Sequence, residues 1–132
     1  MGEAVAIAFY TLHGYSVTVP LTSNARYDLL VEKNGVILRV QCKSTNFIKY
    51  QSTYVVLTRT QGGNQSWNKV SKFLDKAEID LLFVFSLNGQ CYEFPPEFFD
   101  GKGAIILSKD KDQYKVWDFP LPKGLSFLKE KA

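Results

Sequence analysis

The sequence is poor in the residues that build zinc sites and disulfide frameworks. Its 132 residues include two cysteines, Cys42 and Cys91, and a single histidine, His13. Two cysteines without a CxxC spacing are too few for a disulfide scaffold. A zinc site or a histidine-metal nuclease motif needs more His or Cys ligands than this chain offers. The shortage argues against both a disulfide-rich protein and a zinc enzyme.

Several larger features are absent as well. No run approaches the roughly 18–20 apolar residues of a membrane span, and no G-x-x-x-x-G-K-[ST] loop is present to bind a nucleotide cofactor. Glu3 stands where a secretory signal would carry cations. Repeats, low-complexity tracts and linkers are also missing. We therefore expect an intracellular protein, cytoplasmic or nucleoid-associated, with one domain over residues 1–132 and no membrane partner.

The composition suits a folded globule. Hydrophobic residues make up 45% of the chain and aromatic residues 14%. So apolar a chain can offset the entropy lost on ordering, and its length fits the roughly 100–200 residues of one domain.

Acidic residues are missing from the middle of the chain. Between Glu32 and Asp75 there is no acid, although the net charge of the whole chain is only +3. The cations of this stretch are interleaved with aromatic and amide side chains; they are Lys33, Arg39, Lys43, Lys49, Arg59, Lys69 and Lys72. Positive charge with hydrogen-bonding amides suits a nucleic acid, because cations contact phosphates and amides read base edges. The alternative is a solvated surface whose acids are missing by chance.

The hydrophobic pattern predicts a mixed α/β fold. An alanine-rich helix is expected over 3–13, with Gly14 at its C-terminal end. The apolar residues of 67–77 have a helical period and predict a second helix. Strands are expected at 16–19, 27–33, 36–43, 52–59, 81–86 and 90–94, followed by short β segments at 104–107 and 114–117. The order α-β-β-β-β-α-β-β predicts a mixed β-sheet flanked by helices.

A hairpin between residues 27 and 43 makes a sharper prediction. Asn34-Gly35 separates two β-rich runs, and this pair favours a type I′ turn, which needs positive φ at both central positions. A two-residue turn pairs Lys33 with Val36, so every cross-strand pair sums to 69. Asp28 then falls opposite Gln41.

Polar side chains collect at the far end of this hairpin. Because side chains alternate between faces, Asp28, Gln41 and Lys43 are expected to point the same way. Opposed Cβ atoms lie about 4.5–5.5 Å apart, so a carboxylate and an amide oxygen can share one cation. The alternative is an ordinary polar sheet face with a salt bridge.

These residue types suit metal-assisted phosphodiester cleavage. Mg²⁺ prefers hard oxygen ligands, and Asp28, Gln41 and the backbone carbonyl of Cys42 would supply them. Lys43 would hold the attacking water or the charge developing on the phosphate. Glu3, on the first helix, could reach the same site as an outer ligand, or it could simply complement the helix dipole.

The same residues resemble the PD-(D/E)XK nuclease superfamily. The likeness lies in a helix bearing Glu3 (GEAVAIAFYTLHGYSV), in Asp28 of RYDLLVEKNG and in Gln41-Cys42-Lys43 of VILRVQCKST, and KAEIDLLFV resembles the strand after the second helix. It covers residues 1–94 and is closest to the small homing endonucleases encoded in group I introns, which also have Gln where most relatives have Glu or Asp. It implies a restriction-endonuclease-like core with a short irregular β extension at the C-terminus.

The chain departs from the family pattern at two positions. Tyr27 stands where the motif has proline, and Gln41 replaces the acid. The second change removes a negative charge, so metal binding should be weaker when no DNA phosphate is present. It is also compatible with a catalytically inactive nucleic-acid-binding module.

The resemblance implies a Mg²⁺-dependent, site-specific endonuclease of double-stranded DNA, with Mn²⁺ as a substitute ion and homing as its biological setting. A Holliday-junction resolvase is an alternative with the same chemistry. Cutting both strands needs two active sites, so we expect a homodimer or homotetramer. DNA contacts are expected from residues flanking the active-site strand and the loop after the fourth strand: Lys49, Tyr50, Gln51, Arg59, Gln61, Asn64, Gln65 and Lys69.

Overall fold

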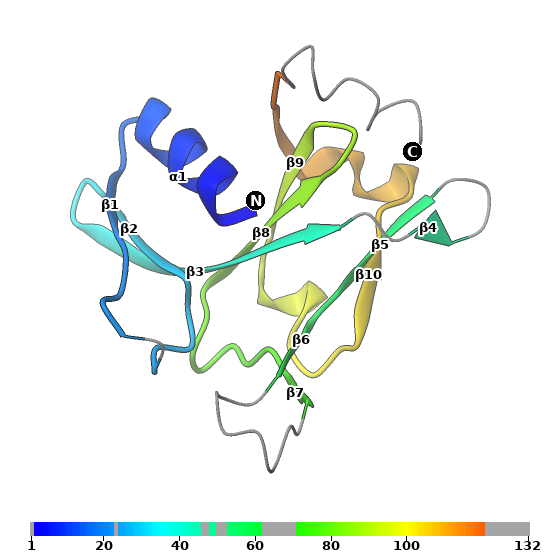
Figure 1. Ribbon diagram of the computed structural model, residues 1–132, viewed down its shortest axis with the longest axis horizontal. Coiled ribbons are helices and arrows are strands. Elements are labelled where there is room, and N and C mark those ends of the chain that lie inside the picture. The colour runs from blue at the N-terminus through cyan, green and yellow to red at the C-terminus, as the bar shows by residue number, and fades with distance from the viewer. Residues whose placement is uncertain (1, 23, 46–47, 50–52, 62–70, 121–132) are drawn as a thin grey trace.

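A computed structural model describes residues 2–22, 24–45, 48–49, 53–61 and 71–120, and its centre is a six-stranded sheet under one helix (Figure 1). The helix is α1 (Gly2–Leu12). The strand order is β1-β2-β3-β8-β9-β11, in which β3 and β8 are parallel and the other neighbours antiparallel. The strands span β1 (Ser16–Thr18), β2 (Leu29–Lys33), β3 (Val36–Thr45), β8 (Leu81–Ser86), β9 (Gln90–Phe94) and β11 (Lys115–Asp118).

Two smaller sheets accompany the large one. The first has the order β10-β5-β4 and the second pairs β6 with β7. Their strands are β4 (Ile48–Lys49), β5 (Thr53–Leu57), β6 (Arg59–Gln61), β7 (Ser71–Phe73) and β10 (Ala104–Ile106), and short 3₁₀ helices occupy Pro96–Phe98 and Lys109–Tyr114. Within the described segments, no helix is long and apolar enough to cross a membrane. The mixed β-sheet predicted from the sequence is confirmed.

Helix α1 covers one face of the large sheet. Its buried residues include Val5, Ala6, Phe9 and Tyr10, whose spacing places them on one side of a helix. They pack on apolar residues from β2, β3 and β8. The Tyr10 hydroxyl donates a 2.5 Å hydrogen bond to Oε2 of Glu93, and burial raises the pKa of that carboxyl. The helix is therefore fixed both by apolar burial and by a partly buried hydrogen bond.

The opposite face of the sheet packs against the three-stranded sheet. Val56 of β5 and Ile105 of β10 join Leu82 and Val84 of β8 in a second apolar cluster. Strand β8 is consequently buried on both sides, as its unbroken apolar sequence predicts. The central strands β3 and β8 thus lie between α1 and the smaller sheet.

The predicted hairpin is confirmed, and its predicted register holds for each pair of the ladder. The pairing predicted between Asp28 and Gln41 is wrong, because β2 begins only at Leu29. Asn34 has φ of 54° and Gly35 has φ of 81°, the two positive values that a type I′ turn needs. Lys33 pairs with Val36, and the pairing of β2 with β3 continues along both strands to Leu29 opposite Val40. This register fixes which residues of β3 face α1 and which face the smaller sheet.

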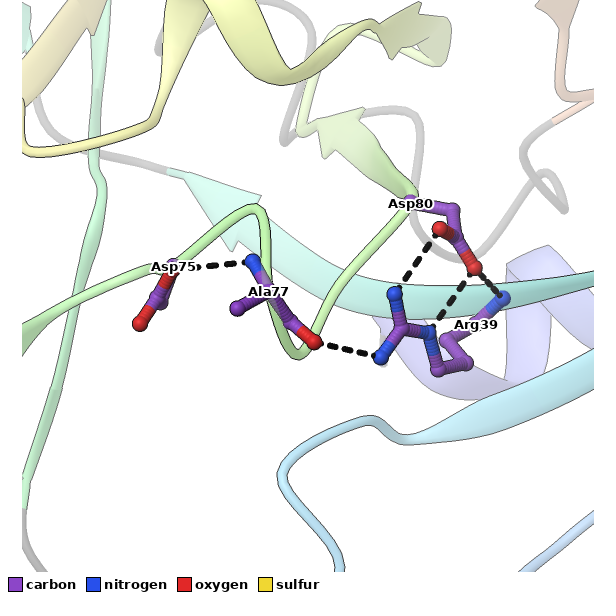
Figure 2. Close-up of polar contacts among 4 residues, drawn as sticks. All are labelled: Arg39, Asp75, Ala77 and Asp80. Carbon is purple, nitrogen blue, oxygen red and sulfur yellow. Dashed lines mark hydrogen bonds and ion pairs between the residues drawn. The ribbon is translucent and has the colours of Figure 1, made fainter.

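An ion pair fixes the start of the parallel pairing between β3 and β8 (Figure 2). Nε and Nη2 of Arg39 donate to the two carboxylate oxygens of Asp80 at 2.9 and 3.0 Å, and Nη1 donates to the Ala77 carbonyl at 2.7 Å. The main chains also join, because the Arg39 N–H donates to Asp80 Oδ2 and the Asp80 N–H donates to the Arg39 carbonyl. The next residues, Val40 and Leu81, begin the parallel ladder that holds Gln41 and Lys43 in place.

Replacing Asp80 should destabilise the protein in a pH-dependent way. We expect Asp80→Asn to lower the free energy of unfolding by about 1 kcal/mol at neutral pH, because it weakens partly exposed, charge-assisted hydrogen bonds. The hydrogen bonds from Arg39 hold the pKa of Asp80 below its ordinary 3.8. The stabilisation is therefore present above that pH and is lost as pH falls through the lowered pKa.

Urea unfolding of wild type and Asp80→Asn, repeated from neutral to acid pH, measures this effect. The matched control is Asp110→Asn, which removes an exposed carboxylate paired with Lys111 and should change stability little. A difference between wild type and Asp80→Asn that stays constant down to acid pH would contradict the prediction.

The prediction of a helix over 67–77 is wrong for 71–77, the part that the structure describes. Residues 67–70 lie outside the described residues, but Ser71–Phe73 forms strand β7, which pairs antiparallel with β6. The apolar period arises from a different arrangement, in which Leu74 is buried and Phe73 is 40% exposed. Hydrogen bonding of the Leu74 N–H to the Thr58 carbonyl continues the ribbon and favours an extended backbone over a helix.

Candidate active site

The candidate site lies where β2 leaves β3. The pairing of these strands ends at Leu29 opposite Val40, whereas β3 runs on to Thr45. Beyond that point a side chain replaces the main-chain partner of β3: Oδ2 of Asp28 accepts a 2.8 Å hydrogen bond from the N–H of Cys42. Asp28 is thereby fixed against the backbone of the strand that bears Gln41 and Lys43.

The orientation of Asp28 differs from strict strand alternation. Its N–H donates to the Val40 carbonyl at 2.9 Å, although Val40 is already the cross-strand partner of Leu29. Two consecutive residues therefore oppose one residue of β3, as at a β-bulge, and a bulge re-aims the side chain next to it. The carboxylate consequently faces the main chain of β3 at Cys42.

Lys43 reaches toward the smaller sheets. Its Nζ donates a 3.0 Å hydrogen bond to the carbonyl of Arg59, the first residue of β6. Burial lowers the pKa of Lys43, and the negative charge of Asp28 opposes this shift. The two groups thus interact electrostatically, although within the described ranges they form no ion pair with each other. The Lys43 ammonium is held between β3 and the strand that begins at Arg59.

Gln41 and Cys42 complete the strand segment. Gln41 is only 8% exposed, and among the described residues its carboxamide forms no hydrogen bond. The Cys42 thiol packs against the α1 cluster, and burial raises its pKa, with further contributions from the charges of Asp28 and Glu3. Such a sulfur stays protonated and is a poor metal ligand. Of the Cys42 groups, only the backbone carbonyl is therefore suited to a hard cation.

Glu3 lies in the first turn of α1 and is exposed. Its carboxylate is close enough to Cys42 to raise the pKa of the thiol. Glu3 therefore comes near the same part of β3 as Asp28, but from the face that α1 covers. The candidate site thus brings together four segments: the start of α1, the approach to β2, the second half of β3 and the start of β6.

A family model described as PD-(D/E)XK endonuclease matches residues 1–116. The chain belongs to the PD-(D/E)XK endonuclease family. It is also similar to the solved structure of a bacterial homing endonuclease, I-Ssp6803I, with 25% sequence identity and a TM-score of 0.68 over 98% of this chain and 89% of that one. A search of curated proteins found no match to the chain. The family resemblance seen in the sequence is thus confirmed.

PD-(D/E)XK nucleases generally use divalent metal ions, so the site should offer suitable ligands. The described residues contain no group of three or more His, Cys, Asp or Glu that could hold a metal. The oxygens at hand are the Asp28 carboxylate, the Gln41 carboxamide and the Cys42 carbonyl, with Glu3 nearby. Few, hard protein ligands fit Mg²⁺, which keeps several of its waters, so the donor set fits such a cation.

Two of the cations in the acid-free stretch of this PD-(D/E)XK chain are paired with acids in space. Arg39 binds Asp80, and Lys72 lies 3.1 Å from Glu78. Both acids follow the stretch in sequence. Asp80 meets Arg39 at the start of the parallel pairing of β3 with β8, whereas Glu78 lies only six residues after Lys72. The positive charge available to a nucleic acid is consequently smaller than the sequence indicates.

The predicted DNA contacts fall partly within the described structure. Arg59 begins β6, and its guanidinium carbon lies 4.5 Å from the centre of the Phe73 ring, a cation–π contact across the β6–β7 ribbon. Gln61 is in β6 and Lys49 in β4. Tyr50, Gln51, Asn64, Gln65 and Lys69 lie outside the described residues. Sequence reasoning did not single out Phe73, and its place in a supposed helix gave no signal for this contact.

Proposed function

We propose that this chain is a Mg²⁺-dependent, site-specific endonuclease that hydrolyses phosphodiester bonds of double-stranded DNA, in the manner of a homing endonuclease. One observation carries the proposal: the Asp28 carboxylate is anchored to the Cys42 N–H, next to Lys43 on the same strand of a PD-(D/E)XK fold. An acid and an ammonium group held at one strand end are the groups that phosphodiester hydrolysis needs.

The residues of the candidate site would divide the work between holding the cation and stabilising charge on the reacting groups. Asp28, Gln41 and the Cys42 carbonyl would hold the cation, with Glu3 acting at longer range. When bound, a Mg²⁺ ion lowers the pKa of water and offsets the charge of the phosphate. Lys43 would donate hydrogen bonds to the attacking water or to the phosphate oxygens, where negative charge develops. The carbonyl of Arg59 accepts a hydrogen bond from the Lys43 ammonium and would hold it in place before DNA binds.

The β6–β7 ribbon is the proposed path for DNA. It is a two-stranded antiparallel element, a shape that enters the major groove. The ribbon begins at Arg59, whose carbonyl accepts the hydrogen bond from Lys43. DNA bound along the ribbon would therefore lie next to the candidate site. The proposed DNA contacts are the cationic, amide and aromatic residues predicted from the sequence: Lys49, Tyr50, Gln51, Arg59, Gln61, Asn64, Gln65 and Lys69. Two copies of the chain would be needed to cut both strands, so we propose a homodimer or homotetramer.

Cleavage of DNA in Mg²⁺ tests the proposed function. The protein is incubated with a pool of long duplexes of diverse sequence, with Mg²⁺ or with EDTA, and the cut ends are sequenced. We expect cuts at one related set of sequences, and none with EDTA. Four-way junctions of arbitrary sequence are the second substrate.

The outcomes separate the alternatives. Preferential cutting of junctions would replace the site-specific assignment with a junction resolvase. DNA binding that weakens with salt but never leads to metal-dependent cutting of either substrate would reduce the chain to a binding module.

Adding a carboxylate at position 41 should strengthen metal binding. Gln41→Glu is expected to increase the affinity for Mn²⁺ in the absence of DNA by about tenfold, because an anionic ligand joins Asp28. Calorimetric titration with Mn²⁺ measures the change. Gln113→Glu adds the same charge at an exposed position far along the chain and controls for net charge. Equal or weaker Mn²⁺ binding by Gln41→Glu would count against the proposed ligand set.

A further inference from the structure

Gly2 brings the start of α1 into direct contact with the main chain of β3. A methyl group on Gly2 would lie 3.0 Å from both the carbonyl carbon and the oxygen of Lys43, and 3.2 Å from the nitrogen of Ser44. Ordinary contacts of this kind lie between 3.4 and 4 Å. The neighbouring atoms are backbone, so no side chain can rotate away to make room. The helix can approach this closely only because residue 2 lacks a Cβ.

The contact falls at the candidate site on both sides. On β3 it involves the main chain of Lys43, the residue that supplies the ammonium group of the site. On α1 the next residue is Glu3, which lies in the first turn of the helix and is exposed. The separation of α1 from β3 at Gly2 therefore sets how far Glu3 lies from the ligands on β3.

We propose that Gly2 is a positioning residue, whose contact with the Lys43 main chain holds Glu3 beside the cation site formed by Asp28 and Gln41. This inference rests on the proposed function, because it takes that site to bind a divalent cation. An alanine at position 2 would push the first turn of α1 away from β3 by a few tenths of an ångström, and Glu3 would move with it.

A packing role alone predicts a different result. If Gly2 served only to let α1 pack, alanine would lower stability without any particular link to Glu3. If it positions Glu3, the alanine has nothing left to disturb once the Glu3 charge is gone. A double-mutant cycle between the two neighbours measures that dependence.

The experiment is calorimetric titration of Mn²⁺ into wild type, Gly2→Ala, Glu3→Gln and the double variant. We expect each single variant to weaken Mn²⁺ binding by roughly tenfold, as changes of outer-shell groups do, and the double variant to bind as weakly as Glu3→Gln alone. Gly103→Ala is the matched control, because its added methyl would lie no closer than 3.8 Å to the side chains of Arg59 and Phe73. It should bind Mn²⁺ like wild type.

The possible outcomes are separable. Wild-type affinity in Gly2→Ala, or losses that simply add in the double variant, would overturn the positioning role and leave the proposed function standing. Absence of Mn²⁺ binding by wild type, together with absence of Mg²⁺-dependent cleavage, would overturn both. Circular dichroism confirms folding, and trimethylamine N-oxide, which favours the folded state, is added to every sample if Gly2→Ala is unfolded in buffer.

Discussion

Asp28→Asn is expected to reduce the rate of Mg²⁺-dependent DNA cleavage by at least about a thousandfold, because it removes the anionic ligand of the proposed cation site. The variant is informative because asparagine keeps an oxygen in nearly the same place. That oxygen can still accept the hydrogen bond from the Cys42 N–H, which Asp28 Oδ2 receives at 2.8 Å. Asp28→Asn therefore changes charge with little change in backbone geometry.

Asp28→Ala separates the structural role of this carboxylate from its charge. Alanine cannot accept the Cys42 hydrogen bond, and leaving a partly buried N–H without a partner costs about 1–3 kcal/mol of stability. We expect both variants to lose cleavage, but only the alanine to unfold at clearly lower urea concentration.

Glu32→Gln is the control for these variants. Glu32 lies on β2, and its carboxylate accepts a hydrogen bond from the Gly35 N–H at the hairpin turn, away from the site. It should cleave DNA at the wild-type rate. Undiminished cleavage by Asp28→Asn, with metal dependence retained, would remove Asp28 from the cation site.

Local chemistry explains which parts of the fold could be predicted from the sequence. The hairpin of β2 and β3 follows from Asn34-Gly35, because a turn that needs two positive φ values selects those residues and then fixes the register. Strand β8 follows from its unbroken apolar run, and α1 from its alanine-rich sequence ending at Gly14, which has φ of 84°. In each case the determining residues are neighbours in the chain.

The features that could not be predicted depend on contacts between distant segments. The acid-free stretch of the sequence presents Arg39 as a cation available to DNA, yet the parallel pairing of β3 with β8 brings Asp80 into contact with it. The strand Ser71–Phe73 lies within 67–77, a run with a helical apolar period, and its pairing with Arg59–Gln61 decides its structure. The tilt of Asp28 toward the Cys42 N–H and the close approach at Gly2 likewise arise from packing, for which the sequence carries no local signal.

Lys43→Met should lower the cleavage rate by about a hundredfold to a thousandfold while leaving DNA affinity nearly unchanged. Methionine keeps most of the apolar stem and removes the ammonium group, which donates to the Arg59 carbonyl at 3.0 Å. The loss should appear in kcat rather than in DNA binding, because the charge is needed where negative charge develops during the reaction. Single-turnover cleavage and a separate DNA-binding titration in Ca²⁺ measure the two effects.

Lys33→Met is a closely matched control for Lys43→Met. The Nζ of Lys33 also donates to a main-chain carbonyl, that of His13, at 2.9 Å, but it lies at the turn end of β2. Lys33→Met removes the same charge and the same type of hydrogen bond, so a difference between the two variants reports the location of Lys43 beside Asp28. Equal cleavage by both variants would show that the ammonium group of Lys43 has no part in the reaction, and would leave its bond to Arg59 as a purely structural link between β3 and the β6–β7 ribbon.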